Sequence, residues 1–517
     1  MNGGDWMVAV VSVPLVAAVA ALLAGRRGAA AAGLLGSLIG TVAVLGLANA
    51  VLAGGVQRMV VGGWSAPLGI ELRADGLSTA MLLITAVVGA GIALYAWRYF
   101  GAPHTIGTQH APGNSPGAPT DRQDWLFWPV WLLAWGALNA LYLSGDLFNL
   151  YVTLELLGLA AVALIALAGA GAAAAALRYL LLALLGSMLY ILGVELLYGV
   201  HQTLDLQQLR ERVQPSLSVG LAAALMTAGL LVKTAVFPLH FWLPPAHGSA
   251  PAPVSAALSA LVVKAGFYLL ARLWLDLFGT LPGAGVVPAL LGALGALAVL
   301  WGGVQALRQT RLKAMIAYST VAQLGYLMIA LPLAAGETAG TVGGALTAAV
   351  LLTASHAAAK ASMFLCAGSL LAAYGHDRID ALGGFGARLP LTAASFALAT
   401  LSLVGLPPTG GFVGKYLLVE SALRAGAWVT IAVVLAGSLL AAMYLFHVLS
   451  RAFVEAPEAP GAATAPATAT ATAPSWPTAP TAPTAPQFAS LALALLAVGL
   501  ALAGGPLGTL LIVGAMR

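Results

Sequence analysis

Long apolar runs follow one another along almost the whole chain, and this pattern restricts the fold to membrane-spanning helices. Of 517 residues, 61% are hydrophobic and 8% are charged, whereas a soluble globular protein carries roughly 25% charged residues. A helix needs about 20 apolar residues to cross a bilayer. The runs predict an all-α polytopic membrane protein with about fourteen transmembrane spans, at approximately 6–24, 29–53, 75–100, 125–143, 147–169, 173–200, 217–243, 252–277, 285–307, 312–333, 341–373, 390–425, 427–453 and 488–514.

The positive charges between the runs indicate how the spans are oriented. Short cytoplasmic loops carry an excess of Lys and Arg. With the N-terminus outside, the outer ends hold seven such residues, namely Arg58, Arg73, Arg210, Arg212, Arg272, Arg424 and Arg517. The inner loops hold eleven, namely Arg26, Arg27, Arg98, Arg122, Arg178, Arg308, Arg311, Lys313, Arg378, Arg388 and Arg451. We therefore predict both termini on the outer side.

Three segments between the runs differ in composition. Residues 54–74 alternate β-branched and polar residues between glycines, which predicts a short external hairpin. The apolar residues in 201–213 have the spacing of an amphipathic surface helix. Residues 455–487 are Ala, Pro and Thr almost throughout, a composition typical of a disordered linker before the last span.

Four of the five lysines lie where a charge is costly. Lys233, Lys264, Lys360 and Lys415 fall near the middle of predicted spans, and Lys313 is predicted in a loop. A lysine at the centre of a membrane helix costs at least about 2.5 kcal/mol. Because burial disfavours the ammonium form, a lysine at this depth can release its proton. We therefore predict a proton relay, with structural ion pairing as the alternative.

Glu155 is the acidic counterpart of these lysines. It lies nine residues past Asp146, roughly 14 Å into the membrane at about 1.5 Å per residue. A nearby lysine would keep the carboxylate ionised, and the separation of the two groups would control both. We predict a switchable pair with Lys233, and a static pair is the alternative.

Histidines accompany the lysines. His356 stands four residues before Lys360, which puts both on one helix face, and His240 lies in the first interrupted span. Histidine titrates near neutrality and suits a relay, although an intramembrane histidine is also found as a hydrogen-bonded packing residue. We predict that His240 and His356 take part, whereas His247 stays open between the two roles.

Prolines and glycines interrupt two spans beside a lysine. Pro238 removes a backbone donor five residues after Lys233. The second interruption, just before Lys415, consists of Pro407, Pro408, Gly410 and Gly411. Paired interrupted spans indicate inverted repeats. Since these two lie five spans apart, they run antiparallel, and we predict an inverted repeat with two broken helices.

Sequence signatures of other chemistry are missing. There is no Walker A sequence, no dinucleotide-binding glycine motif, no HExxH and no CxxC. Cys366, in an apolar run, is predicted to be a buried packing residue. The net charge of +5 is spread over short loops, which argues against a nucleic-acid partner. We expect no cofactor, no metal and no redox or hydrolytic site.

Several stretches resemble one family of membrane proteins. They are GDLFNLYVTLELLGL, KTAVFPLHFWLPPAHGSAPAPVSAALSALVVKAG, RLKAMIAYSTVAQLGY, HAAAKASMFLCAGSLL and GLPPTGGFVGKYLLVESAL. These are similar to the antiporter-like subunits of complex I, membrane-bound hydrogenases and Mrp cation/proton antiporters, and most of all to the D-type subunits of the Mrp antiporters. The resemblance implies fourteen spans with two inverted five-helix units. The domains we predict are three spans with a hairpin in 1–124, repeats in 125–277 and 285–454, the linker 455–487 and a last span in 488–517.

The resemblance also implies an order for the buried charges. Glu155 and Lys233 would form a modulating pair and Lys264 would be the connecting lysine. His356 and Lys360 would continue the axis to the terminal group, Lys415. The sequence departs from the family pattern at Pro245, where Asp usually follows FWLP, which puts a polar role at that position in doubt.

Together, the buried charges and the resemblance predict a proton-translocating subunit of a multisubunit monovalent cation (Na⁺)/proton antiporter. It would lie in a bacterial inner membrane, assembled with other membrane subunits. The alternative is a proton-pumping subunit of a complex I-like quinone reductase or a membrane-bound hydrogenase. A third hypothesis, from another class, is a membrane scaffold that transports nothing. The cation itself stays open.

Overall fold

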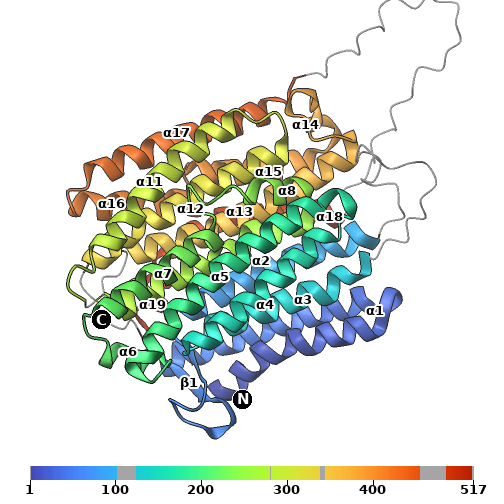
Figure 1. The fold of residues 1–517 in the computed structure, drawn as a ribbon. Helices are drawn as coiled ribbons and strands as arrows, with labels where there is room; N and C mark the ends of the chain where they lie inside the picture. Colours follow the sequence, from blue (N-terminus) through green and yellow to red (C-terminus); the bar gives the residue numbers. More distant parts are fainter. Residues whose placement is uncertain (1, 102–123, 280, 338–343, 455–484, 515–517) are drawn as a thin grey trace, which may run out of the picture.

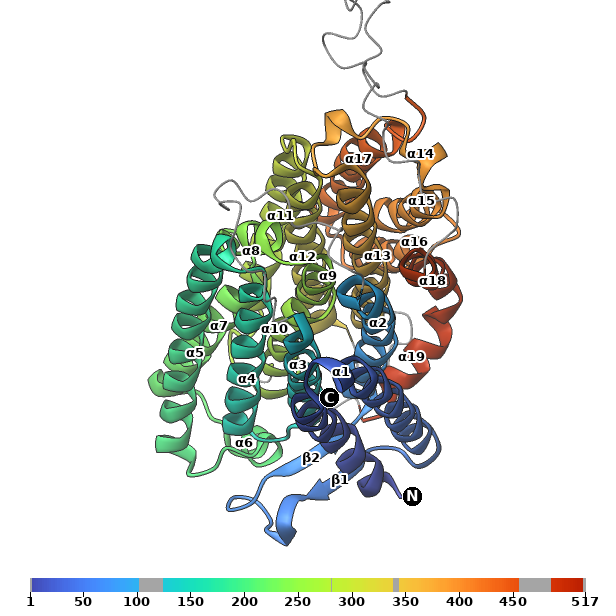
Figure 2. The ribbon, with the colours of Figure 1, turned by 90° about the vertical axis from the view of Figure 1, so that its right-hand side faces the viewer.

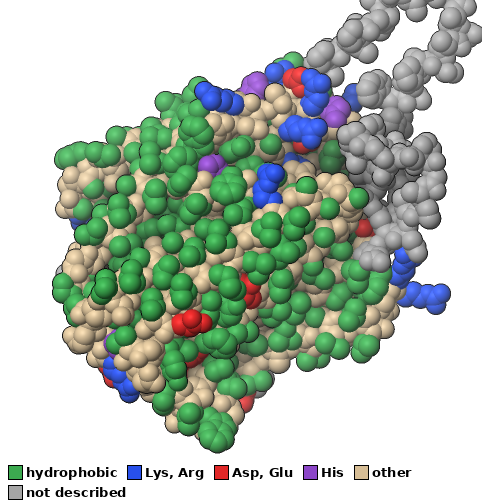
Figure 3. All heavy atoms as spheres, in the orientation of Figure 1, with side chains coloured by type: hydrophobic (Ala, Val, Ile, Leu, Met, Phe, Trp, Pro, Cys, Tyr) green, Lys and Arg blue, Asp and Glu red, His purple; other side chains and the backbone are tan. Residues whose placement is uncertain are grey.

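The computed structural model describes residues 2–101, 124–279, 281–337, 344–454 and 485–514. In this part of the chain, twelve helices are long and apolar enough to cross a membrane, and they pack into one bundle (Figure 1). Hydrophobic side chains cover most of the flank seen in Figure 3, while Lys and Arg gather mostly at its ends. The predicted all-α polytopic membrane protein is confirmed.

The first helix, α1 (Gly3–Gly54), is twice as long as a span needs and folds back on itself. Its backbone leaves helical geometry at Gly25, with φ 56° and ψ −156°. A Cβ atom added at Gly46 would lie 2.5 Å from the Trp6 ring. Because Gly46 and Trp6 stand on opposite sides of Gly25, α1 is a helical hairpin that accounts for the first two predicted spans.

A short β-hairpin marks one end of the bundle (Figure 2). Strands β1 (Gln57–Val60) and β2 (Glu71–Ala74) pair antiparallel, with the turn η1 (Val61–Gly63) after β1. This confirms the hairpin predicted for 54–74. We call this end, which also carries both termini, the hairpin face, and the other end, which carries α14 (Phe385–Arg388), the α14 face (Figure 1).

After α2 (Gly76–Gly101), the first half of the bundle has five membrane segments, of which the fourth is broken. The first three segments are η2 (Asp124–Leu126) with α3 (Phe127–Leu143), then α4 (Leu147–Ala166), then η3 (Ala170–Ala172) with α5 (Ala173–His201). The fourth is the broken pair α7 (Leu217–Thr234) and α8 (Leu243–Ser249). The fifth is one continuous helix made of α9 (Ala252–Ala257), η4 (Leu258–Val262), α10 (Val263–Ala271) and η5 (Arg272–Leu277). η4 and η5 are π-helical, a feature that the apolar pattern did not predict. The surface helix predicted for 201–213 is shorter, at α6 (Leu206–Arg212).

The second half repeats this plan, again with a broken fourth segment. Its segments are α11 (Val286–Leu307), α12 (Leu312–Gly336), α13 (Ala345–Tyr374), the broken pair α15 (Pro390–Val404) and α16 (Gly410–Arg424), and α17 (Trp428–Ser450). The turn η6 (Ile379–Ala381) and α14 connect α13 to α15. The last segment consists of α18 (Ala485–Gly499), η7 (Leu500–Ala503) and α19 (Gly504–Ile512).

The two halves run in opposite directions. α3 ends at the hairpin face, where Ser144 forms a β-bridge with Leu72 of β2. α11, the corresponding helix of the second half, ends at the α14 face, where the following Arg311 bridges Arg378. This arrangement agrees with the predicted pair of inverted five-helix repeats.

Some predictions about the organisation of the chain are not tested by the structure. The count of fourteen spans stays a prediction, because α15 and α16 have only 15 residues each. The domain boundaries also stay predictions, and most of the linker 455–487 lies outside the described residues. Cys366 is buried in α13, as predicted.

Candidate functional site

The ion pair predicted between Glu155 and Lys233 is present. Lys233 stands in the last turn of α7, and its Nζ donates to Glu155 Oε1 on α4 at 2.8 Å. The Lys233 side chain is 7% exposed and that of Glu155 is 18% exposed. A Cβ atom at Gly186 would lie 3.1 Å from Lys233 Cγ, so this glycine leaves room for the lysine. The pair therefore lies at the end of a broken helix, with the carboxylate nearer the outside of the bundle.

The first break begins directly after this lysine. Ala235 adopts a left-handed conformation, with φ 56°, and ends α7. From the far side of the break, Trp242 Nε1 donates to Val232 O at 2.9 Å. Val232 O also accepts from Ala235 N at 3.2 Å, so the indole adds a second donor at the helix end. It also ties the two sides of the break together next to Lys233.

His240 lies in this break but does not meet a lysine directly. The residue is buried, and its ring stacks on Phe237 with centroids 5.6 Å apart. Its Nδ1 has no hydrogen-bond partner among the described residues. The participation of His240 in a relay therefore stays a prediction.

Lys264 is fully enclosed in the middle of the bundle. Its side chain is 1% exposed, and its Nζ donates to the Ser259 carbonyl in the π-helical turn η4. The Ser259 hydroxyl in turn meets Thr320 Oγ1 of α12 at 2.8 Å. The lysine is thus connected through a hydrogen-bonded serine to the neighbouring repeat.

Lys360 reaches the same stretch of α12 from the other side. Its Nζ donates to Ile316 O at 2.9 Å and also contacts Ser319 Oγ. Thr320 Oγ1 donates to the same Ile316 carbonyl at 3.1 Å. Lys264 and Lys360 are therefore connected through Ser259, Thr320 and Ile316. At Ser259 the carbonyl accepts from Lys264 while the hydroxyl bonds Thr320, and at Ile316 one carbonyl accepts from both Thr320 and Lys360.

His356 stands one turn before Lys360 on α13 and is 3% exposed. Neither of its ring nitrogens has a hydrogen-bond partner among the described residues. An unpaired buried imidazole is costly in a purely structural role, so this observation favours a functional role over packing. The participation of His356 in a relay therefore stays a prediction.

Lys415 lies just after the second break and faces back across it. Its Nζ donates to Leu403 O at 3.0 Å, to Val404 O at 2.9 Å and to Ser438 Oγ at 2.9 Å. It also lies 4.8 Å from the centroid of the Tyr326 ring. The first two acceptors are the terminal carbonyls of α15, so the lysine caps the broken helix.

The backbone of the second break is shaped for this lysine. Gly405 has φ 86°, and a Cβ atom there would lie 2.8 Å from Lys415 Cδ. At Gly411, a Cβ atom would lie 1.8 Å from the Ser402 carbonyl oxygen. Pro407, Pro408 and Gly410 complete the interruption between α15 and α16, as predicted.

One polar face of α12 was missed in the sequence. Ser319 contacts Lys360, Thr320 bonds Ser259, and Gln323 Nε2 donates to Leu403 O at 3.2 Å. That carbonyl is also an acceptor of Lys415. The four-residue spacing between Ser319 and Gln323 in YSTVAQ was the available signal.

The loop position predicted for Lys313 is wrong. Lys313 lies in the first turn of α12, is 5% exposed, and its Nζ donates to Ala250 O, just after α8. Nearby, His247 is 0% exposed and stacks on Phe364 at 4.7 Å, and neither of its ring nitrogens has a partner among the described residues. Lys313 and His247 therefore extend the row of buried basic groups toward the α14 face.

The described side chains offer a row of basic and hydroxyl groups but no metal centre. No group of three or more His, Cys, Asp or Glu in the described ranges is placed to hold a metal ion. Between Lys264 and Lys415 the linking groups are neutral hydroxyls, amides and carbonyls. Such a row can hold and pass protons one lysine at a time.

The bundle of inverted halves with a buried cation at each break defines a membrane protein built to handle charge within the bilayer. Residues 144–441, more than half of the chain, match the family model described as "NADH:quinone oxidoreductase/Mrp antiporter, TM". The chain belongs to this family of transmembrane subunits.

Curated relatives come from both branches of the family. The N subunit of the NADH-quinone oxidoreductase of Desulforudis audaxviator is 37% identical over 88% of this chain and 87% of its own length. The D subunit of the Na(+)/H(+) antiporter of Bacillus subtilis is 30% identical over 81% of this chain and 80% of its own. A chain in the structure of the Mrp complex from Dietzia sp. matches with a TM-score of 0.83 and 26% identity, covering 99% of this chain and 97% of its own.

Proposed function

We propose that this protein is a proton-translocating subunit of a multisubunit monovalent cation (Na⁺)/proton antiporter. Protons pass along Glu155, Lys233, Lys264, Lys360 and Lys415, with His240 and His356 beside the path. The observation that carries the proposal is the Glu155–Lys233 ion pair at the broken end of α7, with Nζ and Oε1 2.8 Å apart. The similarity to the D subunit of the Na(+)/H(+) antiporter and to a chain of the Mrp complex supports the cation coupling.

The physical basis is that the charge of each lysine depends on its neighbours. While Glu155 is ionised, it stabilises the ammonium form of Lys233. Protonation of Glu155, or its movement away, removes that stabilisation and favours release of the lysine proton. The released proton then moves toward Lys264. From Lys264 to Lys360 it passes along the hydroxyls of Ser259 and Thr320 with water between them and the lysines, because the carbonyls of Ser259 and Ile316 accept hydrogen bonds but carry no proton.

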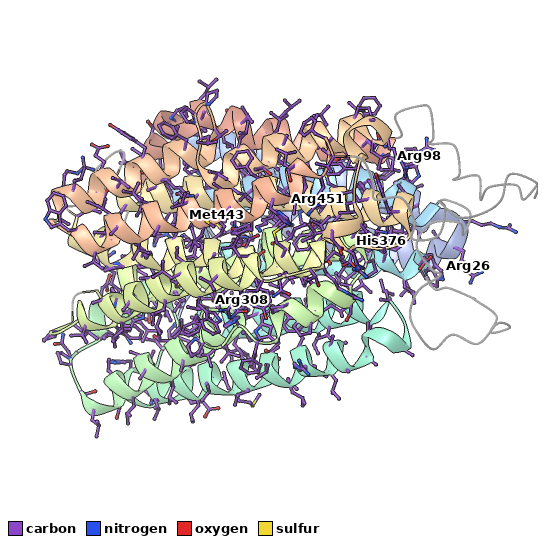
Figure 4. The ribbon with its side chains drawn as sticks, turned by 90° about the horizontal axis from the view of Figure 1, so that it is seen from above. Arg26, Arg98, Arg308, His376, Met443 and Arg451 are labelled. Carbon is purple, nitrogen blue, oxygen red and sulfur yellow. The ribbon has the colours of Figure 1, made fainter. Side chains whose placement is uncertain are left out.

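The distribution of positive charges between the two faces supports an orientation in a bacterial inner membrane with both termini on the outer side. Figure 4 has Arg26, Arg98 and His376 at one end of the bundle, the α14 face. On the hairpin face, Arg73 and Arg272 are largely buried in ion pairs, with side chains 10% and 11% exposed. The larger number of Lys and Arg in the connections at the α14 face, counted in the sequence, favours this face as the cytoplasmic one.

A second candidate function is proton pumping within a complex I-like quinone reductase. The observation in its favour is the 37% identity to the N subunit of an NADH-quinone oxidoreductase. The genes next to this one distinguish the candidates, because small Mrp subunits accompany an antiporter and quinone reductase or hydrogenase subunits accompany a redox complex. In either case the chain works with other membrane subunits.

The proposal is tested in the complete complex, in everted membrane vesicles that carry a pH-sensitive dye. Glu155→Gln and Lys233→Met are each expected to abolish the proton movement that added Na⁺ triggers. Glu420→Gln is the matched control, because Glu420 pairs with Arg424 at the same 2.8 Å but at the surface. Normal exchange in both Glu155→Gln and Lys233→Met, at normal amounts of complex, would exclude the relay.

A further inference from the structure

The helix that carries Lys264 also carries three polar residues that the proposed axis does not use. Tyr268, Arg272 and Asp276 follow Lys264 at intervals of four residues, so all four lie on one helix face. Each interval corresponds to about 6 Å along the axis. The row therefore leads from the middle of the bundle to the hairpin face, where η5 ends at Leu277.

Tyr268 and Arg272 form a buried hydrogen-bonded unit. The Tyr268 hydroxyl donates to Tyr142 O at 2.8 Å and accepts from Arg272 Nε at 3.1 Å. The guanidinium of Arg272 also donates to Asp75 Oδ1, and to Asp276 Oδ2 at 2.9 Å. Tyr268 is 2% exposed and Asp75 1% exposed. Arg272 is thus held between the carboxylates of Asp75 and Asp276, one helical turn after Tyr268.

A second arginine balances the charge of this cluster. Arg73 Nε lies 3.6 Å from Asp75 Oδ2, so two guanidinium groups face two carboxylates, Asp75 and Asp276. Burial alone would raise the pKa of Asp75, yet the charges of Arg272 and Arg73 and hydrogen bonds from Arg272 and Ser78 outweigh burial and hold this pKa below its ordinary value. Asp75, which precedes α2, stays ionised and keeps Arg272 in place.

A cavity opens from this cluster toward the hairpin face. Tyr268, Arg272 and Asp276 line its inner side, and Glu71, Asp205 and Arg210 are among the residues of its outer side. The backbone at Glu71, Gly145 and Leu206 covers the cavity. These segments are hydrogen-bonded to one another, since Gly145 N donates to Glu71 O and Leu206 N donates to Gly145 O, each at 2.9 Å. The cavity therefore brings polar side chains of the surface segments close to Tyr268 and Arg272.

We propose that this row is an opening of the proton axis at the hairpin face, with Tyr268 as its relay hydroxyl and Arg272 as its charge gate. The inference rests on the proposed function. Lys264 turns from Ser259 O toward Tyr268 and transfers its ammonium proton to the tyrosine oxygen. In the same step the Tyr268 hydroxyl leaves its acceptor, Tyr142 O, and passes its own proton to a water molecule in the cavity, which becomes hydronium. Lys264 becomes a neutral amine and Tyr268 stays neutral. The guanidinium of Arg272, bonded to the Tyr268 hydroxyl and to both carboxylates, occupies the inner end of the cavity, so that a proton or another cation cannot bypass the Tyr268 hydroxyl.

The decisive variant is Tyr268→Phe, which removes the hydroxyl and keeps the ring against Tyr142. In everted vesicles with the complete complex, we expect Na⁺-triggered proton movement to fall at least tenfold at an unchanged amount of complex. The matched control is Tyr95→Phe, which removes another buried hydroxyl bonded to a carbonyl, that of Leu365 at 3.0 Å, and should leave the rate unchanged. A Tyr268→Phe rate within twofold of the unmodified rate overturns the relay.

The gate has its own measurement, the passive decay of a pH gradient without added cation. Arg272→Gln is expected to speed this decay at least threefold, and an unchanged decay in the complete complex overturns the gate. If Arg272→Gln prevents assembly, Tyr268→Phe decides the proposal. Measuring Glu155→Gln alongside separates the hypotheses. If Glu155→Gln loses exchange while Tyr268→Phe exchanges normally, only the proposed opening at the hairpin face is rejected. If Glu155→Gln exchanges normally, the proposed function itself is rejected.

Discussion

The two broken helices hold their lysines in different ways. Lys233 precedes its break and its Nζ is paired with a carboxylate, Glu155, at 2.8 Å. Lys415 follows its break, and its hydrogen-bond acceptors are the carbonyls of Leu403 and Val404 and the hydroxyl of Ser438. One ammonium is therefore stabilised by a full charge and the other by neutral dipoles and the ring of Tyr326.

This difference indicates a division of roles between the halves. A carboxylate can be protonated or can move, so the stabilisation of Lys233 can be switched by the state of Glu155. Backbone carbonyls do not change charge, so the environment of Lys415 changes only if the break itself moves. We infer that the environment of Lys233 can be switched by a change of charge, whereas that of Lys415 can be switched only by movement of the backbone.

The largest expected effect comes from breaking the charged pair. Lys233→Met leaves Glu155 without its partner at a largely buried position, and breaking such a pair costs about 3 kcal/mol or more. Lys415→Met leaves no opposite charge behind and should destabilise less. Thermal unfolding of the purified complex measures both. The double variant Glu155→Gln/Lys233→Met should recover stability but not transport, and equal losses for Lys233→Met and Lys415→Met would refute the distinction.

Arginine substitutions separate charge from proton transfer. Arginine keeps the positive charge but does not deprotonate in proteins, so Lys233→Arg should preserve the pair with Glu155 and the amount of complex. Transport should still fall about a hundredfold, the scale of a lost acid–base group. Exchange assays on Lys233→Arg and Lys415→Arg provide the test. Near-normal exchange in Lys233→Arg would show that its charge alone suffices.

The fold and the first pair could be predicted because they depend on strong and local signals. Runs of apolar residues define the spans, Pro238 and the Pro407–Gly411 stretch define the breaks, and Glu155 and Lys233 were the charges whose depth required partners. These features follow from the cost of polar groups in a bilayer, which few other arrangements satisfy.

Other parts of the site could not be predicted, each for a physical reason. Lys313 stands at the edge of a run, so its burial depends on the carbonyl of Ala250 from a distant segment. Ser319, Thr320 and Gln323 have the uncharged side chains that helices often satisfy internally. The π-helical turns η4 and η5 belong to a helix that is buried along most of its length, so no apolar face reveals the period.

The backbone at the two breaks should respond in opposite directions. Gly405 has φ 86° and contacts Lys415, so Gly405→Ala adds strain of about 1–2 kcal/mol and displaces the lysine. The corresponding residue of the first break, Ala235, already carries such strain at φ 56°, so Ala235→Gly should raise stability by up to about 1 kcal/mol. Thermal unfolding checks both. A stabilising Gly405→Ala would contradict the proposed shape of the second break.

The smallest expected effect concerns the link between the halves. Thr320→Val keeps the shape of the side chain but removes the hydrogen bond to Ser259 and the one to Ile316 O, at a cost of about 1 kcal/mol. Exchange should fall a few-fold, since the lysines at both ends of the link remain. The matched control is Thr353→Val on α13, because the Thr353 hydroxyl is equally buried and, within the described residues, bonds only to Ala349 O of its own helix. If the two variants exchange equally well, the bridge through Thr320 is not part of the route.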